Sequence, residues 1–428
     1  ISVCDWSSDV CSSDLDEVVT AAVQEDVQGV AVSSYQGGHV EYFKYLVDLL
    51  RERGAGHVKV FGGGGGVIVR SEIDELHDYG VSRIFSPHDG QEMGLPGMIN
   101  SLVRSCDVDL ADELPTSLDP LFTGDAATLA RVITGIEADR LASVHRAEIR
   151  AAAEARSVPV LGITGTGGSG KSSLTDELVR RFRLDYEDKL RVAVIAIDPT
   201  RRKGGGALLG DRIRMNSIDP ATVYFRSLAT RTAGAVVPDG LDDTVAAAKA
   251  WGADLVIVET PGIGQGDAAI VDHVDVAMYV MTPEFGAASQ LEKIDMLDFA
   301  DVVAINKFDR RGGEDALRDV GRQLVRNTEA FSSTAADMAV FGTVASRFND
   351  DGVTGLYGEL KRQLAHHGLV APTDGGALAP VDTKVSSADT AIVPPSRSRY
   401  LAEVAEAVRA HRSTVEEQAS VARELQQV

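Results

Sequence analysis

The chain has 428 residues, 44% of them hydrophobic and 25% charged, which is the composition of a folded protein of about three domains rather than of a disordered one. Its 64 acidic and 42 basic residues give a formal net charge of −22, so nucleic acids and anionic membranes are excluded as main partners. Three cysteines cannot build a disulfide framework, and no apolar run reaches the roughly 18 residues of a membrane span, so we expect a cytoplasmic protein without a secretory signal.

Residues 1–15 differ from the rest of the chain. They hold two of the three cysteines and one of the two tryptophans, and they show neither helical nor strand periodicity. They are either a frayed native terminus or, from residue 4 onward, a translated sequencing-library adapter, which they resemble. We favour the second interpretation, in which the segment is non-native and the natural N-terminus is missing.

Residues 16–105 alternate helices with strands and are expected to form one small domain. The pattern predicts helices at 18–25, 40–53 and 71–79, and strands at 27–33, 58–61 and 81–85. This alternation predicts a parallel, doubly wound α/β sheet, and such sheets bind ligands beyond the carboxyl ends of their strands. Two loops are expected there, residues 33–39 and the five glycines at 62–66.

These two loops are similar to those of a known family. The stretch SSYQGGHVEYFKYLVDLL, followed by VFGGGGGVIV, resembles the flavodoxin-like cobalamin-binding domain of acyl-CoA mutases. The resemblance implies that Ser33, Tyr35 (a leucine in the family), Gly65 and Gly66 contact the nucleotide tail of adenosylcobalamin. By composition alone, the five glycines are also compatible with a flexible surface loop.

The lower cobalt ligand of that family is a histidine in the motif Asp-x-His-x-x-Gly, and none of the nine histidines of this chain occupies such a motif. His77 matches it in part but follows the glycine loop, so we interpret it as a solvated helix residue. His39 is interpreted as a loop or packing residue. The resemblance therefore implies an N-terminally truncated domain. Its binding of cobalamin would be strongly weakened, although contacts to the nucleotide tail of the cofactor would be retained.

Residues 106–157 are expected to connect two domains. Residues 107–119 are acidic and contain a proline, with another at position 120, which is typical of a linker. Residues 126–156 have the pattern of one long helix, whose apolar residues would pack against the domain that follows.

A phosphate-binding motif opens the domain expected at residues 158–370. A buried-strand pattern at 158–163 runs into GTGGSGKS, and a helix is predicted at 173–182, which is the strand–loop–helix context that this motif requires. The backbone N–H groups of such loops bind phosphates at a helix N-terminus. We expect Lys171 to neutralise phosphate charge as a catalytic residue and Ser172 to bind Mg²⁺. The nucleotide contacts expected in the loop are Gly165, Gly167, Gly168, Ser169, Gly170, Lys171, Ser172 and Ser173.

A second motif predicts the base. A strand at 302–305 ends in Asn306-Lys307-Phe308-Asp309, the Asn-Lys-x-Asp sequence of G proteins, whose carboxylate accepts two hydrogen bonds that guanine donates and adenine does not. Ala345 and Ser346, after a strand at 339–344, fit a further base-contacting loop. We therefore expect GTP as the nucleotide rather than the ATP of a kinase.

Two further strand ends resemble the MeaB-like G-protein chaperones of cobalamin mutases. One is AIDPTRRKGGGALLGDRIRM, which starts in a strand at 192–197, and the other is ETPG after a strand at 255–258, where small G proteins have Asp-x-x-Gly. The resemblance implies that Arg214 lies near the phosphates and that Glu259 is catalytic. It also implies that Mg²⁺, which carboxylates suit, lies near Ser172, Asp198, Asp211, Glu259 and Thr260. Asp211 and Arg214 are equally compatible with a surface ion pair, and we do not expect Gln265 to position the attacking water.

Residues 371–395 have the composition of a linker, and residues 396–427 have the pattern of a helix. The order of cobalamin domain, G domain and helix resembles the fused isobutyryl-CoA mutase family. That resemblance implies a Mg²⁺-dependent GTPase chaperone that gates cofactor loading for a mutase domain absent from this chain. It also implies a full protein that is a homodimer and interconverts isobutyryl-CoA and n-butyryl-CoA.

Two alternatives stay open at this point. The first is a stand-alone cobalamin sensor in which the G domain is regulatory or degenerate. The second is a metallochaperone-type GTPase, which would need a Cys/His metal cluster that we do not find in the sequence.

Overall fold

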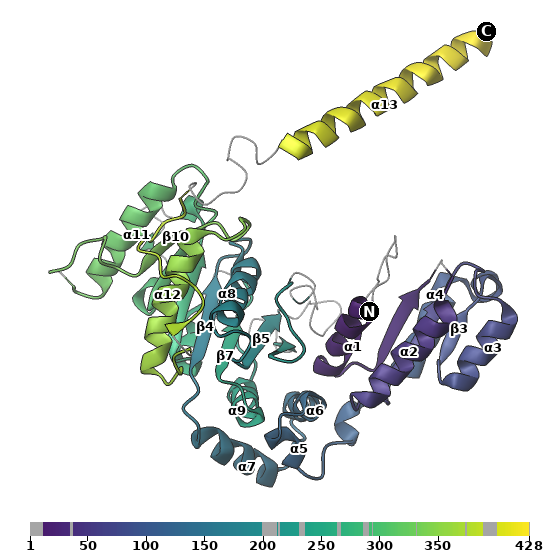
Figure 1. Cartoon of the computed structure of the whole chain (residues 1–428), viewed down its shortest axis with the longest axis horizontal. Coiled ribbons are helices and arrows are strands. Elements are labelled where there is room, and N and C mark those ends of the chain that lie inside the picture. The colour runs from purple at the N-terminus through teal and green to yellow at the C-terminus, as the bar shows by residue number, and fades with distance from the viewer. Residues whose placement is uncertain are drawn as a thin grey trace.

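The computed structural model in Figure 1 describes residues 12–34, 37–198, 212, 215–230, 236–262, 267–285, 291–292, 294–330, 332–372, 375–387 and 400–427. The expectations for residues 1–11 and for Tyr35, Asp211, Arg214 and Gln265 lie outside these described residues. The helices are α1 (Ser12–Gln24), α2 (His39–Glu52), α3 (Arg70–Tyr79), α4 (Pro87–Cys106), α5 (Asp119–Phe122), α6 (Ala126–Glu137), α7 (Ser143–Glu154), α8 (Lys171–Asp185), α9 (Leu241–Trp251), α11 (Gly313–Asn327), α12 (Asp351–His366) and α13 (Tyr400–Gln427). Short 3-10 helices are η1 (Leu110–Asp112), η3 (Asp267–His273), η4 (Pro283–Phe285) and η5 (Asp295–Asp298).

The N-terminal sheet has three parallel strands, β1 (Gly29–Ser33), β2 (Lys59–Gly63) and β3 (Arg83–Phe85), in that order. The alternation of helices and strands predicted for this region is confirmed, but α1 begins at Ser12 rather than at residue 18. It therefore starts inside the segment in which no helical periodicity was expected, and Leu15 of that segment is buried at 3% exposure. Helix α2 buries Phe43 and Leu46, both 0% exposed. Gly62 permits this close packing, because a Cβ there would lie 2.5 Å from the Phe43 ring.

Helix α4 was not predicted. Its sequence contains Gly94-Leu-Pro-Gly97, which is typical of a turn, and Gly94 does adopt non-helical angles (φ 66°, ψ 170°). The helix nevertheless resumes after this kink. Its start is fixed by Ser86 and Asp89, each of whose side chains accepts a hydrogen bond from the backbone N–H of the other.

The connection between the two sheets differs from the prediction in two ways. The single helix expected at 126–156 is wrong, because α6 and α7 are separate and Asp139 between them has a left-handed φ of 52° that an α-helix cannot contain. The acidic linker is also more structured than expected. It contains η1, and Leu110 and Leu118 are buried at 9% and 2% exposure.

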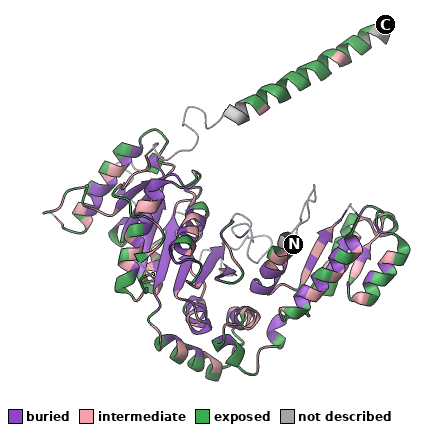
Figure 2. Cartoon of the chain, viewed as in Figure 1, coloured by how far each residue is buried: buried purple, intermediate pink, exposed green. Residues whose placement is uncertain are grey.

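The second sheet has seven strands in the order β10-β9-β8-β4-β7-β5-β6, and every pairing is parallel. Figure 2 shows its strands as buried. The parallel α/β fold predicted for this domain is confirmed, although β6 was missed because Arg226 and Ser227 interrupt its apolar run. The strands are β4 (Val160–Gly165), β5 (Val192–Asp198), β6 (Val223–Ala229), β7 (Leu255–Glu259), β8 (Val276–Met281), β9 (Val302–Asn306) and β10 (Val340–Thr343).

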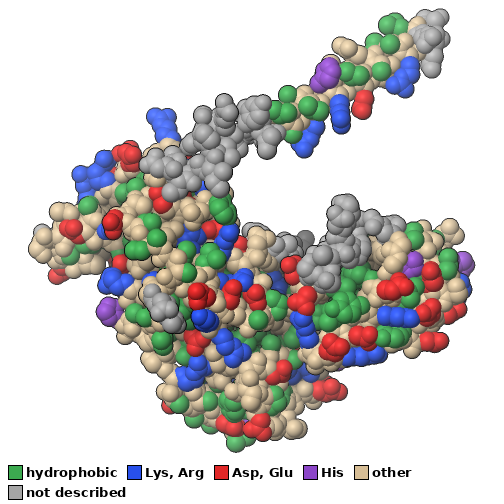
Figure 3. Space-filling model, viewed as in Figure 1, with side chains coloured by type: hydrophobic (Ala, Val, Ile, Leu, Met, Phe, Trp, Pro, Cys, Tyr) green, Lys and Arg blue, Asp and Glu red, His purple; other side chains and the backbone are tan. Residues whose placement is uncertain are grey.

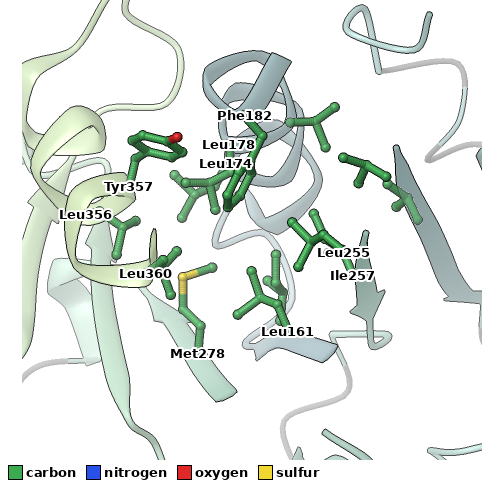
Figure 4. Packing of buried hydrophobic residues seen from close by; sticks show 14 of the residues in the cluster. Leu161, Leu174, Leu178, Phe182, Leu255, Ile257, Met278, Leu356, Tyr357 and Leu360 are labelled. Carbon is green, nitrogen blue, oxygen red and sulfur yellow. The ribbon is translucent and has the colours of Figure 1, made fainter. Parts of the chain in front are cut away.

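The main core of this domain lies between the sheet and two helices. Helices α8 and α12 contribute apolar side chains that face the strands β4, β7 and β8 (Figure 4). The ring of Phe182 is fully buried and meets Tyr357 edge to face, with the ring centroids 4.9 Å apart. The labelled members of this core are Leu161, Leu174, Leu178, Phe182, Leu255, Ile257, Met278, Leu356, Tyr357 and Leu360.

The end of α1 packs on the outer strand β6 of the large sheet. Gln24 Nε2 donates to the Val223 carbonyl (3.0 Å), and Gln24 Oε1 accepts from the Phe225 N–H (3.2 Å). Glu25 accepts from the Ser227 N–H at 3.0 Å. The N-terminal sheet is thus joined to the large sheet by buried polar contacts as well as by the connecting helices.

The C-terminal region also differs from the expectation. Residues 371–395 were predicted to be a linker, but their described part, up to residue 387, packs on the large sheet and forms a parallel bridge between Val385 and Gly342 of β10. Most described side chains of α13 are exposed, and Figure 2 shows the helix standing away from the rest. No helix in the described ranges is long and apolar enough to cross a membrane.

Candidate functional site

The phosphate loop connects β4 to α8. Gly165 ends the strand, and a Cβ at this residue would lie 1.9 Å from the Val280 carbonyl oxygen. Gly168 and Gly170 have left-handed φ values of 74° and 88°, which favour glycine. Helix α8 begins directly afterwards at Lys171, so its free N–H groups and positive dipole end face the space enclosed by the loop.

The loop is built to hold an anion. Lys171 is 7% exposed, and its Nζ donates to the carbonyls of Gly165 (3.0 Å) and Thr166 (3.3 Å). The Thr166 and Ser169 hydroxyls are buried and have no hydrogen-bond partner among the residues that the structure describes, and such groups usually have one. A cavity of about 310 Å³ extends from this loop to Gly262. These groups fit a phosphate ligand.

A buried carboxylate lies beside the loop. Glu259, at the end of β7, is 3% exposed and accepts hydrogen bonds from the Ser172 hydroxyl (2.7 Å) and the Thr175 hydroxyl (2.9 Å). Asp198, 4% exposed, ends the neighbouring strand β5. The next residue after Glu259 is Thr260, whose hydroxyl donates to that of Thr164 at 2.8 Å. Hard oxygen ligands of this kind suit Mg²⁺.

The Asn-Lys-x-Asp motif reaches the same loop from β9. Asn306 Nδ2 donates to the Ser169 carbonyl (2.8 Å), and Lys307 Nζ donates to the Gly168 carbonyl (2.6 Å). Asn306 Oδ1 accepts from the Ala345 N–H at 3.1 Å. Two segments more than 130 residues apart in the sequence therefore meet at one place.

The remaining predicted nucleotide residues border this place. Asp309 lines a cavity of about 440 Å³ together with Val344 and Arg347. Ser346 is exposed in the loop after β10, and Ser173 is exposed in the first turn of α8. Both side chains are therefore open to a ligand.

A different pocket lies at the carboxyl ends of the N-terminal strands. It has a volume of about 510 Å³, and its wall is mainly apolar, with Ser33 and Gly65 on it and α4 along one side. Gly66 stands close to the pocket at φ 96°, and a Cβ there would lie 3.2 Å from Pro87. The loop residues Ser33, Gly65 and Gly66 were predicted to lie at this pocket, whereas the wall formed by α4 was not predicted.

Both histidines weighed for this region have partners within the domain. His39 Nε2 lies 3.0 Å from Glu72 Oε2, and His39 is 7% exposed, which agrees with a packing residue. His77 is exposed, as expected, but its Nε2 also accepts the Ile84 N–H at 3.0 Å.

The comparisons with known proteins agree with the phosphate and base motifs. Residues 129–371, more than half of the chain, match the family described as Methylmalonyl Co-A mutase-associated GTPase MeaB. The chain belongs to the MeaB family. This family assignment covers the large sheet and the helices α6 and α7 before it, but not the N-terminal sheet.

Relatives extend the similarity beyond the MeaB region. A fused isobutyryl-CoA mutase of Nocardia farcinica is 65% identical over 412 residues, which cover 96% of this chain and 38% of the relative. One of Cupriavidus metallidurans is 61% identical over 412 residues, with the same coverage. A Pyrococcus abyssi relative named as a GTPase is 34% identical over 256 residues, which cover 59% of this chain and 75% of that protein. The chain thus spans less than half the length of the fused mutases.

The sequence analysis did not identify one side chain that lies beside the phosphate loop. Thr175 holds Glu259 from the second turn of α8, and it follows Ser172 by three residues. This i, i+3 spacing puts both hydroxyls on one face of the helix. Helical spacing alone could therefore have suggested it.

Proposed function

We propose that this chain is the Mg²⁺-dependent GTPase chaperone region of an adenosylcobalamin-dependent acyl-CoA mutase. The observation that carries the proposal is the contact of Asn306 and Lys307 with the carbonyls of Ser169 and Gly168. It joins a guanine-reading motif to a phosphate loop, so one nucleotide can span both. Membership of the MeaB family supports the same reading.

The residues around the phosphate loop have complementary roles in this proposal. Lys171 Nζ would exchange its hydrogen bonds to the two loop carbonyls for contacts that neutralise the β- and γ-phosphates. Ser172, Asp198, Glu259 and Thr260 would hold Mg²⁺, directly or through its waters. When bound, the ion offsets the charge that develops on the phosphates during transfer. Glu259 also fixes the Ser172 hydroxyl.

The N-terminal pocket is proposed to take the tail of the cobalamin. Its apolar wall suits a planar base, and Gly65 lets a ligand approach the backbone. Nucleotide turnover would gate cofactor loading for a mutase domain that follows in the full protein, which we propose is a homodimer that isomerises isobutyryl-CoA and n-butyryl-CoA. The fused mutases support the presence of a further domain, because this chain covers only 38% of each of them.

The base assignment is tested by Asp309→Ala. The variant removes the carboxylate that would accept two hydrogen bonds from guanine, so the preference for GTP over ATP should fall about 100-fold or more. Both affinities are measured by competition with a fluorescent nucleotide, alongside GTP hydrolysis.

The matched control is Asp319→Ala, which removes a partly exposed carboxylate from α11. It should leave the preference unchanged. An Asp309→Ala protein that still selects GTP as well as the parent does would refute the assignment.

A further inference from the structure

Residues 383–387, here called the strap, form an unexpected part of the large domain. They run beside the outer strand β10, where the Gly342 N–H donates to the Lys384 carbonyl and the Ser386 N–H donates to the Gly342 carbonyl, both at 2.8 Å. Lys384 Nζ also donates to the carbonyls of Ala336 (2.7 Å) and Met338 (2.8 Å). The strap is therefore held as an extra, short parallel segment of the sheet.

Helix α12 has a notch that fits the strap. A Cβ on Gly352 would lie 2.6 Å from the Ser386 nitrogen, and one on Gly355 would lie 2.2 Å from the Thr383 carbonyl oxygen. Gly352 lies in the first turn of α12 and Gly355 lies further inside the helix, where glycine costs about 1 kcal/mol relative to alanine. The close approach of the strap gives a structural reason for this cost.

The strap also holds both ends of the loop that follows β10. Asp350 is 0% exposed, and its Oδ1 accepts from the Val344 N–H (3.2 Å) and the Val353 N–H (2.9 Å). Its other oxygen accepts from the Ser386 hydroxyl. Arg347 Nη1 in turn donates to Ser386 Oγ (2.9 Å). Ser386 thus links the start and the end of the loop, through Asp350, to Arg347 in its middle.

Ser387 adds a second link. Its N–H donates to Asp351 Oδ1 at 2.9 Å, and its hydroxyl donates to Asp351 Oδ2. Its carbonyl accepts from Arg347 Nη1 at 3.1 Å. Ser386 and Arg347 line the same cavity as Asp309, so the strap stands at the base side of the nucleotide site.

We propose that the strap is a positioning element for the guanine base. By fixing Asp350 and Arg347, it holds the loop with Ala345 and Ser346 in the geometry that reads the base beside Asp309. The inference rests on the proposed GTPase function and extends it past residue 371, where the match to the MeaB family ends. Because coupling is reciprocal, bound guanine nucleotide must also tighten the strap, which lies on the path to α13.

The first test is a Ser386→Ala/Ser387→Ala variant of the full chain. Its Kd for fluorescent GDP should rise at least about tenfold, because two hydrogen bonds to carboxylates are lost and one such bond already corresponds to about a tenfold change, while the weak binding of ADP stays unchanged. A loss of general stability would weaken both nucleotides equally. Ser386→Thr, which keeps the hydroxyl, should retain the affinity for GDP, and Ser413→Ala on exposed α13 is the matched control.

The second test needs no substitution. Amide hydrogen exchange at Gly342, Ser386 and Ser387 of the unmodified chain should slow when GDP is added. A folded double variant with the GDP-over-ADP preference of the parent, or strap amides that do not respond to GDP, would overturn the inference while leaving the GTPase proposal intact. An unmodified chain that binds no guanine nucleotide would overturn both.

Discussion

At the scale of single residues, Asp26 shows how a buried charge is stabilised between the two sheets. It accepts from Arg131 Nε (2.9 Å) and Nη2 (3.1 Å) and from the Thr134 hydroxyl (2.7 Å), and His57 Nε2 lies 3.5 Å away. Burial raises the pKa of Asp26, but the hydrogen bonds from His57, Arg131 and Thr134 outweigh burial and lower the pKa from 3.8 to about 2.

The depressed pKa predicts an acid-sensitive contribution to stability. The stabilisation by Asp26 is fully present above pH 3.8, and it is lost as the pH falls from there through about 2, because the unfolded state binds a proton at a higher pH than the folded state does. Asp26→Asn tolerates the left-handed φ of 47°. It should lower the free energy of unfolding by about 2 kcal/mol near neutral pH and flatten its dependence on pH below 4.

Chemical denaturation at several pH values measures this effect. Asp74→Asn, in an exposed pair with Arg70, should have almost no effect. If the free energy of unfolding depended on pH in the same way for the Asp26 variant and the parent, the role given to Asp26 would be wrong.

At the scale of secondary structure, α8 serves both the core and the site. One end presents Lys171 and Ser172 to the phosphate loop, and the body buries Leu174, Leu178 and Phe182 at 0% exposure against the sheet. Figure 4 shows these side chains facing the strands and α12. The packing therefore fixes the orientation of the helix N-terminus.

Truncation of this packing predicts a large loss of stability. Phe182→Ala removes a fully buried ring from its contact with Tyr357 and should cost about 3–5 kcal/mol of unfolding free energy. Leu184→Ala on the same helix, at 51% exposure, should cost far less. Urea unfolding of both variants measures the difference, and equal losses would show that the core assignment is wrong.

At the scale of the whole molecule, the two sheets are tied by a buried polar interface. Arg212, 9% exposed, donates to Gln24 Oε1 (2.8 Å) and lies 3.4 Å from Glu25 Oε1. Arg226 donates to the Gln24 carbonyl (3.2 Å) and to Glu137 Oε2 (2.8 Å). Elsewhere, acidic and basic side chains are interspersed over the visible surface (Figure 3).

The interface predicts strong dependence on one glutamate. Glu25→Ala leaves the Arg212 charge buried without its carboxylate, which should cost about 3–5 kcal/mol. Glu17→Ala, on the exposed side of α1, is the control. Unfolding monitored by denaturant tests this, and a loss below about 1 kcal/mol would contradict it.

The sequence predicted those parts of the fold that have a local signal. Strands β4, β5, β7 and β9 are largely continuous apolar runs, as buried parallel strands usually are. Strand β6 was hidden because Arg226 and Ser227 look exposed in the sequence. Their burial depends on partners that folding brings to them, among them Glu137 for Arg226 and Glu25 for Ser227. The break between α6 and α7 at Asp139 was not predicted, because no glycine or proline stands at this position to indicate it.

The same distinction holds for the site. The phosphate loop and Asn306-Lys307-x-Asp309 were recognised from their spacing, and the folded chain brings them into contact. The strap could not be predicted, because its composition is that of a linker. Its role depends on a notch at Gly352 and on Asp350, which only folding places beside it.

The contacts of Gln24 and Glu25 with β6 also bear on how the protein avoids aggregation. The outer strands of an open sheet expose N–H and C=O groups that can pair with another chain. On β6, backbone groups of Val223, Phe225 and Ser227 bond to the side chains of Gln24, at the end of α1, and of Glu25, which follows it. On β10, the backbone groups of Gly342 bond to the strap. Both margins of the sheet are thus partly closed to intermolecular strand addition by segments outside the MeaB match.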